Sequence, residues 1–588
     1  MLKVMEMIKK LFRQMLLTQI LSAMTVTLCM LIDSIMIGRF LGIESMSAYG
    51  YSTPVLLVFA AVGSMISAGV QVMCGRTMGS GDKEGTNACF TVSVALTAIF
   101  SIVGMAAVLI FTDPLCTLLG AGENTPDNTV FALTRDYLRG FIIGAPAFMA
   151  AQIMVPYMQM SGSRTRLVVA VIAMTLGDVL FDILNVFVIK QGTFGMGLAS
   201  SLSYYIAFVI GVIYFFKKEC IFKFKLALFK FRTCVRLMKD GVPTLVNQVS
   251  LVLLTLLLNQ LLTNLGGSTA VAAYSVISTV GNICYSFSSG VAAVALTLSS
   301  IFYADEDKPT LTELVRVMLK NAVLICAVVT AVIVLAAKPL VMLFIQDMSA
   351  VDMAITGLRL FVLSLVPCAL NTTLKNYYQG VERVGLTLTI SVMQNFALTA
   401  LGAFVISRFA GVTGVWLGFL TGEGLTFIFI CIYVFVKRGS RRFGVQSFSL
   451  IPEDFGAADD CCLDVSVTAA EDVVTVSKQA SDFCKEKGLA KRTGSLMALA
   501  VEEMSNNIIE YGFADGRKHS IDIRIVVSEG ETILRIRDNC IGFDPVKYLE
   551  LHQGDDPVAH IGIKMVMKLV KDANYVNSLG LNNLRLTL

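Results

Sequence analysis

The chain has 588 residues, of which 55% are hydrophobic and 15% charged, and its formal net charge is +4. This length exceeds what one hydrophobic core organises, and this composition excludes an ordinary soluble protein, so most of the chain is expected to lie in lipid. The small net charge, with lysine and arginine mostly in loops between apolar runs, excludes a nucleic-acid partner.

Apolar segments long enough to cross a bilayer, roughly 20 residues each, follow one another until about Lys437. Each can satisfy its backbone in lipid only as a helix. The expected fold is therefore a polytopic all-α membrane protein with twelve transmembrane helices. The segments lie near residues 15–37, 50–74, 88–112, 136–158, 167–189, 194–216, 241–263, 272–302, 321–345, 353–377, 385–408 and 412–436.

Basic residues are concentrated on one side of these expected helices. They include Lys9 and Lys10, Arg164, the segment 217–239 and the segment 437–442. Because cytosolic loops of membrane proteins are enriched in lysine and arginine, both termini are expected in the cytosol. The sequence thus predicts a multi-pass protein of the plasma (cytoplasmic) membrane.

Landmarks in the first half of the membrane region recur in the second half. Leu41-Gly42 recurs as Leu265-Gly266, and Pro146 in the fourth span corresponds to Pro367 in the tenth. This pattern predicts two six-helix lobes in parallel repeat, with the substrate path between them. The lobes are expected at residues 1–218 and 219–440.

Acidic residues inside the first lobe are candidates for a cation-coupling site. Asp178, Asp182 and Asn185 share one face of the fifth span, and Asp33 lies near the end of the first span. Ionisable groups in lipid usually mark a translocation path. Two carboxylates in one pocket would share H⁺ or Na⁺, and the choice between these ions stays open. The alternative is a hydrogen-bonded helix contact with no transport role.

Other charges occur in the second lobe. Glu423 lies in mid-span between Gly422 and Gly424, where a substrate or another helix can approach closely, so it is a candidate for the substrate path. Lys338 and Lys375 lie near span ends, and their side chains are expected to extend to the membrane surface.

Three further sequence features are Asp33 to Arg39, the stretch Ala68 to Gln71 followed by Gly79 to Asp82, and Gly162 with Arg164. Together they resemble the multidrug and toxin extrusion (MATE) family over about residues 8–438. The resemblance implies that Asp33 and the fifth-span acid Asp182 form a cation site, and that cation release accompanies drug export as the lobes rock. Relatives often carry Asn where this chain has Asp178.

A linker is expected at residues 441–462, and a small α/β domain at 463–588, where short strands alternate with charged helices. Its motifs are Ala498 to Tyr511, Asp538 to Pro545, and Ile561 to Ile563 before a helix. In this order they resemble the histidine-kinase-like ATPases, most closely the bacterial anti-sigma-factor serine kinases.

The resemblance implies a role for each motif. Glu503 would polarise an attacking group, Asn507 would hold Mg²⁺ against ATP phosphates, and Asp538, with Gly542 in the same turn, would bind adenine. Gly562 would bring a helix N-terminus near phosphate.

Two residues depart from the glycines usual in that family. Cys540 and His560 stand at these positions, so nucleotide binding without turnover and serine kinase activity both stay open.

These features predict a secondary active exporter of organic or cationic compounds, driven by H⁺ or Na⁺ influx and carrying a nucleotide-binding regulatory domain. The alternative is a membrane sensor whose C-terminal domain phosphorylates a serine on a partner that resembles an anti-sigma antagonist. A lipid flippase is disfavoured because the spans lack many basic residues.

Overall fold

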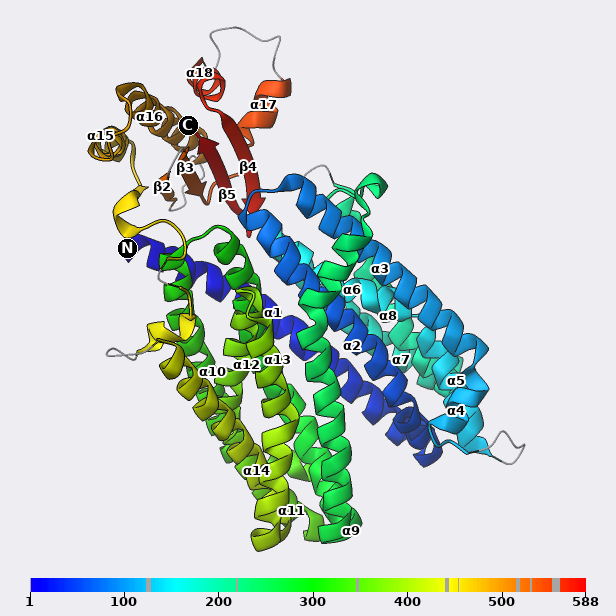
Figure 1. Ribbon diagram of the computed structural model, residues 1–588. Helices are drawn as coiled ribbons and strands as arrows, with labels where there is room; N and C mark the ends of the chain where they lie inside the picture. The colour runs from blue at the N-terminus through cyan, green and yellow to red at the C-terminus, as the bar shows by residue number, and fades with distance from the viewer. Residues whose placement is uncertain are drawn as a thin grey trace.

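The computed structural model describes residues 2–122, 128–217, 220–344, 348–438, 444–452, 454–513, 519–528, 531–551 and 561–588. Two helical bundles carry a smaller C-terminal domain at one end, and in Figure 1 they converge toward that end and separate toward the other. We call these the domain end and the far end.

The first lobe contains the helices from the N-terminus to Phe215. They are α1 (Leu2–Met36) with η1 (Ile37–Leu41), α2 (Ile43–Gly79), α3 (Lys83–Ile110), α4 (Thr112–Leu118), α5 (Thr129–Ile142), α6 (Ala145–Met160), α7 (Arg164–Leu184) with η2 (Asn185–Ile189), and α8 (Gly192–Phe215).

The second lobe follows the short helix η3 (Leu226–Leu228). Its helices are α9 (Phe231–Ala304), α10 (Lys308–Met342), α11 (Met348–Val362), α12 (Leu365–Gly380), α13 (Val384–Val392) with η4 (Met393–Ala397), and α14 (Leu398–Arg438). Both α9 and α14 are interrupted by a glycine, Gly267 with φ 62° and Gly411 with φ 57°. Only glycine adopts such angles readily, so each break divides one long element into two spans.

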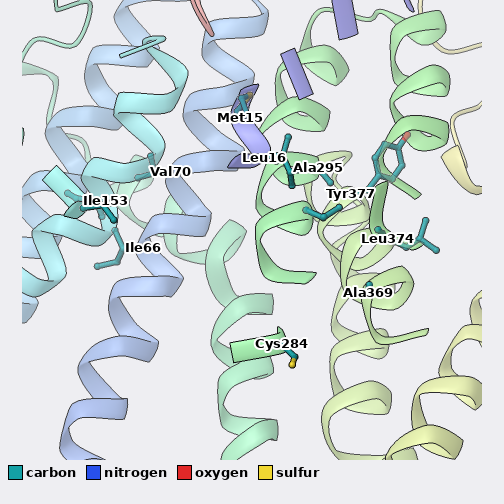
Figure 2. Packing of buried hydrophobic residues seen from close by; sticks show 14 of the residues in the cluster. Met15, Leu16, Ile66, Val70, Ile153, Cys284, Ala295, Ala369, Leu374 and Tyr377 are labelled. Atoms are coloured by element: carbon teal, nitrogen blue, oxygen red, sulfur yellow. The ribbon is translucent and has the colours of Figure 1, made fainter. Parts of the chain in front are cut away.

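The helices confirm the membrane fold expected from the sequence. Among the described residues, nine helices are long and apolar enough to cross a membrane, and two bent helix pairs raise the number to eleven. One of the nine, residues 384–438, holds 55 residues and contains the break at Gly411, so it accounts for two spans. A buried apolar cluster joins the lobes, with Ile66, Val70 and Ile153 on one side and Leu374 and Tyr377 on the other (Figure 2).

The lobes pack closely at the domain end because small residues line the contact. A Cβ atom at Gly69 would overlap the carbonyl oxygen of Leu237, and one at Gly241 would overlap that of Met65. Arg76 of α2 crosses the contact to Asp240, at 3.0 Å. Glycine therefore serves here to let helix backbones approach each other.

The C-terminal domain is an antiparallel five-stranded sheet in the order β1-β2-β3-β5-β4, with helices packed on one face. Its strands are β1 (Cys462–Val467), β2 (Ile521–Ser528), β3 (Glu531–Asp538), β4 (Asp572–Ser578) and β5 (Leu581–Thr587). Its helices are η6 (Asp459–Cys461), α15 (Ala470–Glu486), α16 (Lys491–Gly512), α17 (Pro545–Leu551) and α18 (Ile561–Leu569). The small α/β domain expected from the sequence is thereby confirmed.

Strand alternation gives this sheet one apolar and one charged face. Ile523 of β2 and Leu534 of β3 pack on the helices, whereas Arg524, Arg535 and Arg537 point the other way. Arg524 and Arg535 are directly paired across the strands, an arrangement that is unfavourable unless anions separate them.

Two aspartates from the second lobe supply those anions, at the turn between α9 and α10. Asp307 Oδ1 accepts from Arg524 at 2.8 Å, and its Oδ2 accepts from Arg535 at 3.0 Å. Asp305 Oδ2 accepts from Arg537 at 2.7 Å and also pairs with Arg535. Burial alone would raise the pKa of Asp307, but Arg535, Arg524 and Arg537 hold that pKa well below its usual range. The charged sheet face is thus neutralised by docking on the second lobe.

The first lobe meets the opposite edge of the same sheet. The turn between β4 and β5 rests on the end of α6, where the Leu579 amide donates to Met160 O at 2.5 Å and Arg164 donates to Leu579 O at 2.9 Å. Asn574 of β4 donates to the carbonyl of Gly81. The domain therefore contacts both lobes (Figure 1).

The segment that leads into the domain runs along the second lobe. It includes η5 (Val445–Ser449), and hydroxyl groups of α12 donate to it, from Tyr377 to Ser449 O at 3.2 Å and from Tyr378 to Phe448 O at 3.0 Å. Arg438 donates to Ile451 O at 2.9 Å. These bonds hold the linker against the second lobe, whereas the aspartate turn holds the sheet itself.

We expect Asp307→Asn to weaken domain docking by about 3–5 kcal/mol, because it leaves buried guanidinium groups without their anion. The measurement is hydrogen exchange of the β2 and β3 amides in the purified chain, which should become faster. Because the pKa of Asp307 is lowered, its carboxylate stabilises docking fully at any pH above the ordinary carboxyl range and loses this effect only at lower pH. The difference in exchange rate between Asp307→Asn and the wild type should therefore be equal at pH 6 and pH 8.

Glu313→Gln is the matched control. It removes a carboxylate of α10 that is 12% exposed and pairs with the more exposed Arg316 at 2.8 Å, apart from the contacts of Asp305 and Asp307 with the sheet. Exchange in the sheet should stay as in the wild type, and equal exchange in Asp307→Asn would contradict the docking role.

Candidate functional site

Three carboxylates from two helices meet inside the first lobe. Asp33 comes from α1, and Asp178 and Asp182 lie one turn apart on α7. All three are buried, and the carboxyl group of Asp33 lies within hydrogen-bonding reach of both others. Ser200 of α8 donates to Asp33 Oδ2 at 3.2 Å. The structure therefore brings together the acidic residues that the sequence placed on two separate spans, Asp33 on the first and Asp178 and Asp182 on the fifth.

Several oxygens of these carboxylates lack donors. Among the described residues, Asp33 Oδ1, Asp178 Oδ2 and both oxygens of Asp182 have no hydrogen-bond partner. Buried carboxylates that face one another without donors are unfavourable when they are all ionised. A shared proton or a bound cation removes this cost, so the arrangement is suited to holding and releasing a small cation.

Several side chains around the carboxylates were not singled out from the sequence. Cys29 lies next to Asp178, and the rings of Tyr49 and Tyr137 meet edge to face with centroids 5.4 Å apart. Both tyrosines and Tyr204 lie within electrostatic range of the carboxylates. These four residues come from four different helices, α1, α2, α5 and α8, so no spacing pattern within one segment of the sequence indicates that they meet.

Asn185 has a different environment from the carboxylates. Its amide nitrogen donates to Gly192 O at 2.9 Å, and its oxygen accepts from the Gln191 amide at 3.1 Å. A Cβ atom at Gly195 would overlap this side chain. Asn185 thus holds the turn between α7 and α8, although it shares a helix face with Asp178.

Glu423 of α14 is buried within the second lobe. Asn371 donates to Glu423 Oε2 at 2.8 Å and Gln394 donates to Oε1 at 3.3 Å. Its carboxylate is therefore provided with donors, in contrast to those of the first lobe.

Lys375 corrects an expectation from the sequence. Its side chain does not extend to the membrane surface, because only 4% of the residue is exposed and it lines a cavity between the lobes. The ammonium group donates to Asn247 and to Gln394 Oε1, the latter at 3.3 Å. A position near a helix end says nothing about which way the side chain faces, and here α12 faces the other lobe. Lys338 is exposed as expected.

The second candidate site is a pocket of about 410 Å³ in the C-terminal domain, lined by Asn507, Asp538 and Gly542 among others. Asp538 Oδ1 accepts from the Cys540 amide at 2.9 Å and from Asn582 at 2.7 Å. Burial raises the pKa of Asp538, and the hydrogen bonds from Asn582 and Cys540 oppose that rise. This buried acceptor at the wall of an apolar pocket fits the amino group of a purine base.

Glu503 and Gly562 lie next to each other at one end of this domain. A Cβ atom at Gly562 would overlap the Glu503 carboxylate, so a larger residue there would displace that side chain. Asn507 donates to Glu503 O at 2.6 Å and reaches the pocket wall. If ATP is bound, Asn507 is the residue placed to hold Mg²⁺ against its phosphates.

Cys540 and His560 stand where the histidine-kinase-like ATPases usually have glycine. Cys540 packs against Gly512, and its backbone does not adopt a positive φ, so the larger side chain causes no strain of that kind. His560 lies outside the described residues.

Family models match both parts of the chain. The MatE model matches residues 19–184 and 243–405, and the model of the histidine kinase-like ATPase domain matches residues 467–588. Multidrug export protein MepA of Staphylococcus saprophyticus is 21% identical over 402 residues, which cover 68% of this chain and 87% of that protein. The probable multidrug resistance protein YoeA of Bacillus subtilis is 22% identical over 419 residues, with coverage of 68% and 88%.

Solved structures share the fold of the two lobes. The Vibrio cholerae MATE transporter VcmN in its bent form has a TM-score of 0.68 at 16% identity, covering 76% of this chain and 98% of that one. A multidrug resistance MATE family transporter in an outward-facing conformation has a TM-score of 0.68 at 20% identity, with coverage of 72% and 94%.

We expect Asp182→Asn to raise the melting temperature of the purified chain by about 2 °C or more, since it removes one like charge and supplies donors to the neighbouring carboxylates. Differential scanning fluorimetry measures this. Asp352→Asn is the control, because Asp352 is exposed on α11 and its change should leave the melting temperature unaltered. A lower melting temperature for Asp182→Asn would contradict the unfavourable burial of these groups.

Proposed function

This chain belongs to the MatE family, and from that premise we propose that it is a secondary active exporter of organic compounds, drugs among them. Inward flow of H⁺ or Na⁺ drives export across the plasma (cytoplasmic) membrane. The observation that carries the proposal is the group of three buried carboxylates with unpartnered oxygens, Asp33, Asp178 and Asp182.

The orientation proposed here places the domain end in the cytosol. Arg164, Lys217 and Lys437 lie at that end of their helices, as expected for cytosolic loops. The close contact of Gly69 with Leu237 and the pair of Arg76 and Asp240 then close the path on the cytosolic side. A cation from outside would bind the carboxylates in the first lobe, and its release inside would follow rocking of the lobes.

The C-terminal domain regulates this movement in our proposal. It is held on the second lobe by Asp305 and Asp307, while the turn at Leu579 contacts the first lobe. Movement of one lobe against the other must therefore break or shift one of the two contacts.

The nucleotide pocket is linked to the same interface. Asp544, beside the pocket residue Pro545, pairs with Lys83 of α3 at 3.4 Å. ATP bound against Asp538, Gly542 and Asn507 would change the turn that carries Asp544, so nucleotide occupancy would alter contact with the first lobe. This is a regulatory role, and it requires no hydrolysis.

Asp33→Asn combined with Asp182→Asn is expected to abolish gradient-driven uptake into inside-out vesicles, because no carboxylate pair is left to exchange a cation. Rhodamine 123 and fluorescein serve as probes, each under a H⁺ and then a Na⁺ gradient. The exposed Asp352→Asn variant should transport like the wild type. Wild-type rates in the double variant would refute the coupling site, and absence of transport by the wild-type chain would favour the sensor alternative.

A second test separates regulation from transport. Asp305→Asn combined with Asp307→Asn should transport like a chain that ends at Arg442, because both lose the docked domain. Asp538→Asn should lower the affinity of the full chain for ATP by about tenfold or more, through loss of a buried acceptor, and abolish any effect of ATP on transport. Regulation by docking would be refuted if ATP still altered the transport rate of the undocked variant.

A further inference from the structure

A cavity of about 440 Å³ lies between the two lobes, with walls from α1, α2 and α6 of the first lobe and α9, α12 and α13 of the second. Its polar lining consists of amides and hydroxyls, such as Gln152, Gln248 and Asn376. Among the described residues that line it, Lys375 is the only one with a charged side chain. The cavity therefore carries a single positive charge in a neutral wall.

Lys375 has no carboxylate as a direct partner among the described residues. Its ammonium group donates to two amide oxygens, those of Asn247 and Gln394, and within the described parts of the chain no carboxylate lies within 4.0 Å of it. An ammonium group has three N–H donors, so one is left for another acceptor. A buried charge with neutral partners alone is unfavourable, and an incoming anion would relieve that cost.

The acidic group of the second lobe does not serve this purpose. Glu423 accepts hydrogen bonds from Asn371 and from Gln394, and Gln394 lies between it and Lys375. Gln394 thus gives its nitrogen to the carboxylate and its oxygen to the ammonium group. The lysine is held at the cavity wall while the acid stays behind it.

The remaining wall suits the rest of an organic anion. Thr372 and Tyr285 provide hydroxyl groups on the same side as Lys375, which can bind further oxygens of a carboxylate or sulfonate. Phe148, Val155 and Leu251 provide apolar surface for a carbon skeleton. An organic cation finds no acidic side chain among these lining residues and would lie next to Lys375.

From this charge arrangement we propose that the cavity binds organic anions, with a carboxylate or sulfonate group paired to Lys375. The proposal rests on the exporter function above and names its substrate class. It departs from the cationic compounds expected from the sequence. Recognition depends on the second lobe, whereas the coupling cation binds in the first.

The test measures equilibrium binding to the detergent-solubilised full chain by fluorescence anisotropy. Fluorescein and rhodamine 123 share a xanthene scaffold but carry opposite charge, and empty micelles correct for partitioning. Fluorescein should bind the wild type about tenfold more tightly or better, as one charge pair in a largely enclosed site can provide. Equal or tighter binding of rhodamine 123 would overturn the proposal without recourse to any variant.

Variants locate the charge. Lys375→Met should weaken fluorescein binding by about tenfold or more and leave rhodamine 123 binding equal or stronger, whereas Lys375→Arg should keep the preference for the anion. The control is Lys338→Met, which removes an exposed lysine of the same lobe. Unchanged fluorescein affinity in a folded Lys375→Met chain would overturn the assignment.

A failure of the anion-site proposal can be distinguished from a failure of the coupling site, because the binding measurement applies no ion gradient. The double variant of Asp33 and Asp182 should bind fluorescein like the wild type even where it fails to transport. Loss of fluorescein binding in that variant would count against a substrate site carried by the second lobe.

Discussion

The turn between α9 and α10 makes the contact on which the arrangement of the two parts depends. Asp305 and Asp307 enter a sheet face that carries three arginines, two of them directly paired across neighbouring strands. Without these anions the face would repel itself, and with them it is buried against the second lobe. This ionic contact, together with the turn at Leu579, positions the domain over both lobes and brings the candidate nucleotide pocket near the first lobe.

Buried charge is treated in three different ways in this molecule. The arginines and aspartates of the docking contact neutralise each other, which suits a permanent contact. The carboxylates of Asp33, Asp178 and Asp182 face one another with several oxygens unpartnered, which suits a site that gains and loses a cation. Lys375 has only neutral partners and faces a cavity, which suits a site for an anion. In the proposed transport cycle the carboxylates and Lys375 must remain incompletely partnered, whereas the charges of the docking contact are paired.

Glycine has a separate structural task at the domain end. Gly69 and Gly241 let helices of opposite lobes touch through their backbones at the domain end. Gly69 belongs to a stretch that carries the family resemblance. A physical reason for that stretch is thus visible in the packing of α2 against α9.

The sequence by itself determined the elements that have a local signal. The length of the apolar segments predicted the spans, and landmarks that recur in both halves predicted the two lobes. Helical spacing placed Asp178 and Asp182 on one face of the fifth span. Alternation gave the strands of the C-terminal domain, and motif order gave its nucleotide pocket. Each of these depends on residues close together in the chain, which is why they can be recognised without a structure.

Only the tertiary structure decided which side chains from distant parts of the chain contact each other. It placed Lys375 at a cavity wall instead of the membrane surface, turned Asn185 to the backbone of its own turn, and surrounded the carboxylates with tyrosines from other helices. It also joined Asp307 to Arg524, more than two hundred residues away in the chain. The physical reason is that helix periodicity fixes which residues share a face but leaves open what that face packs against.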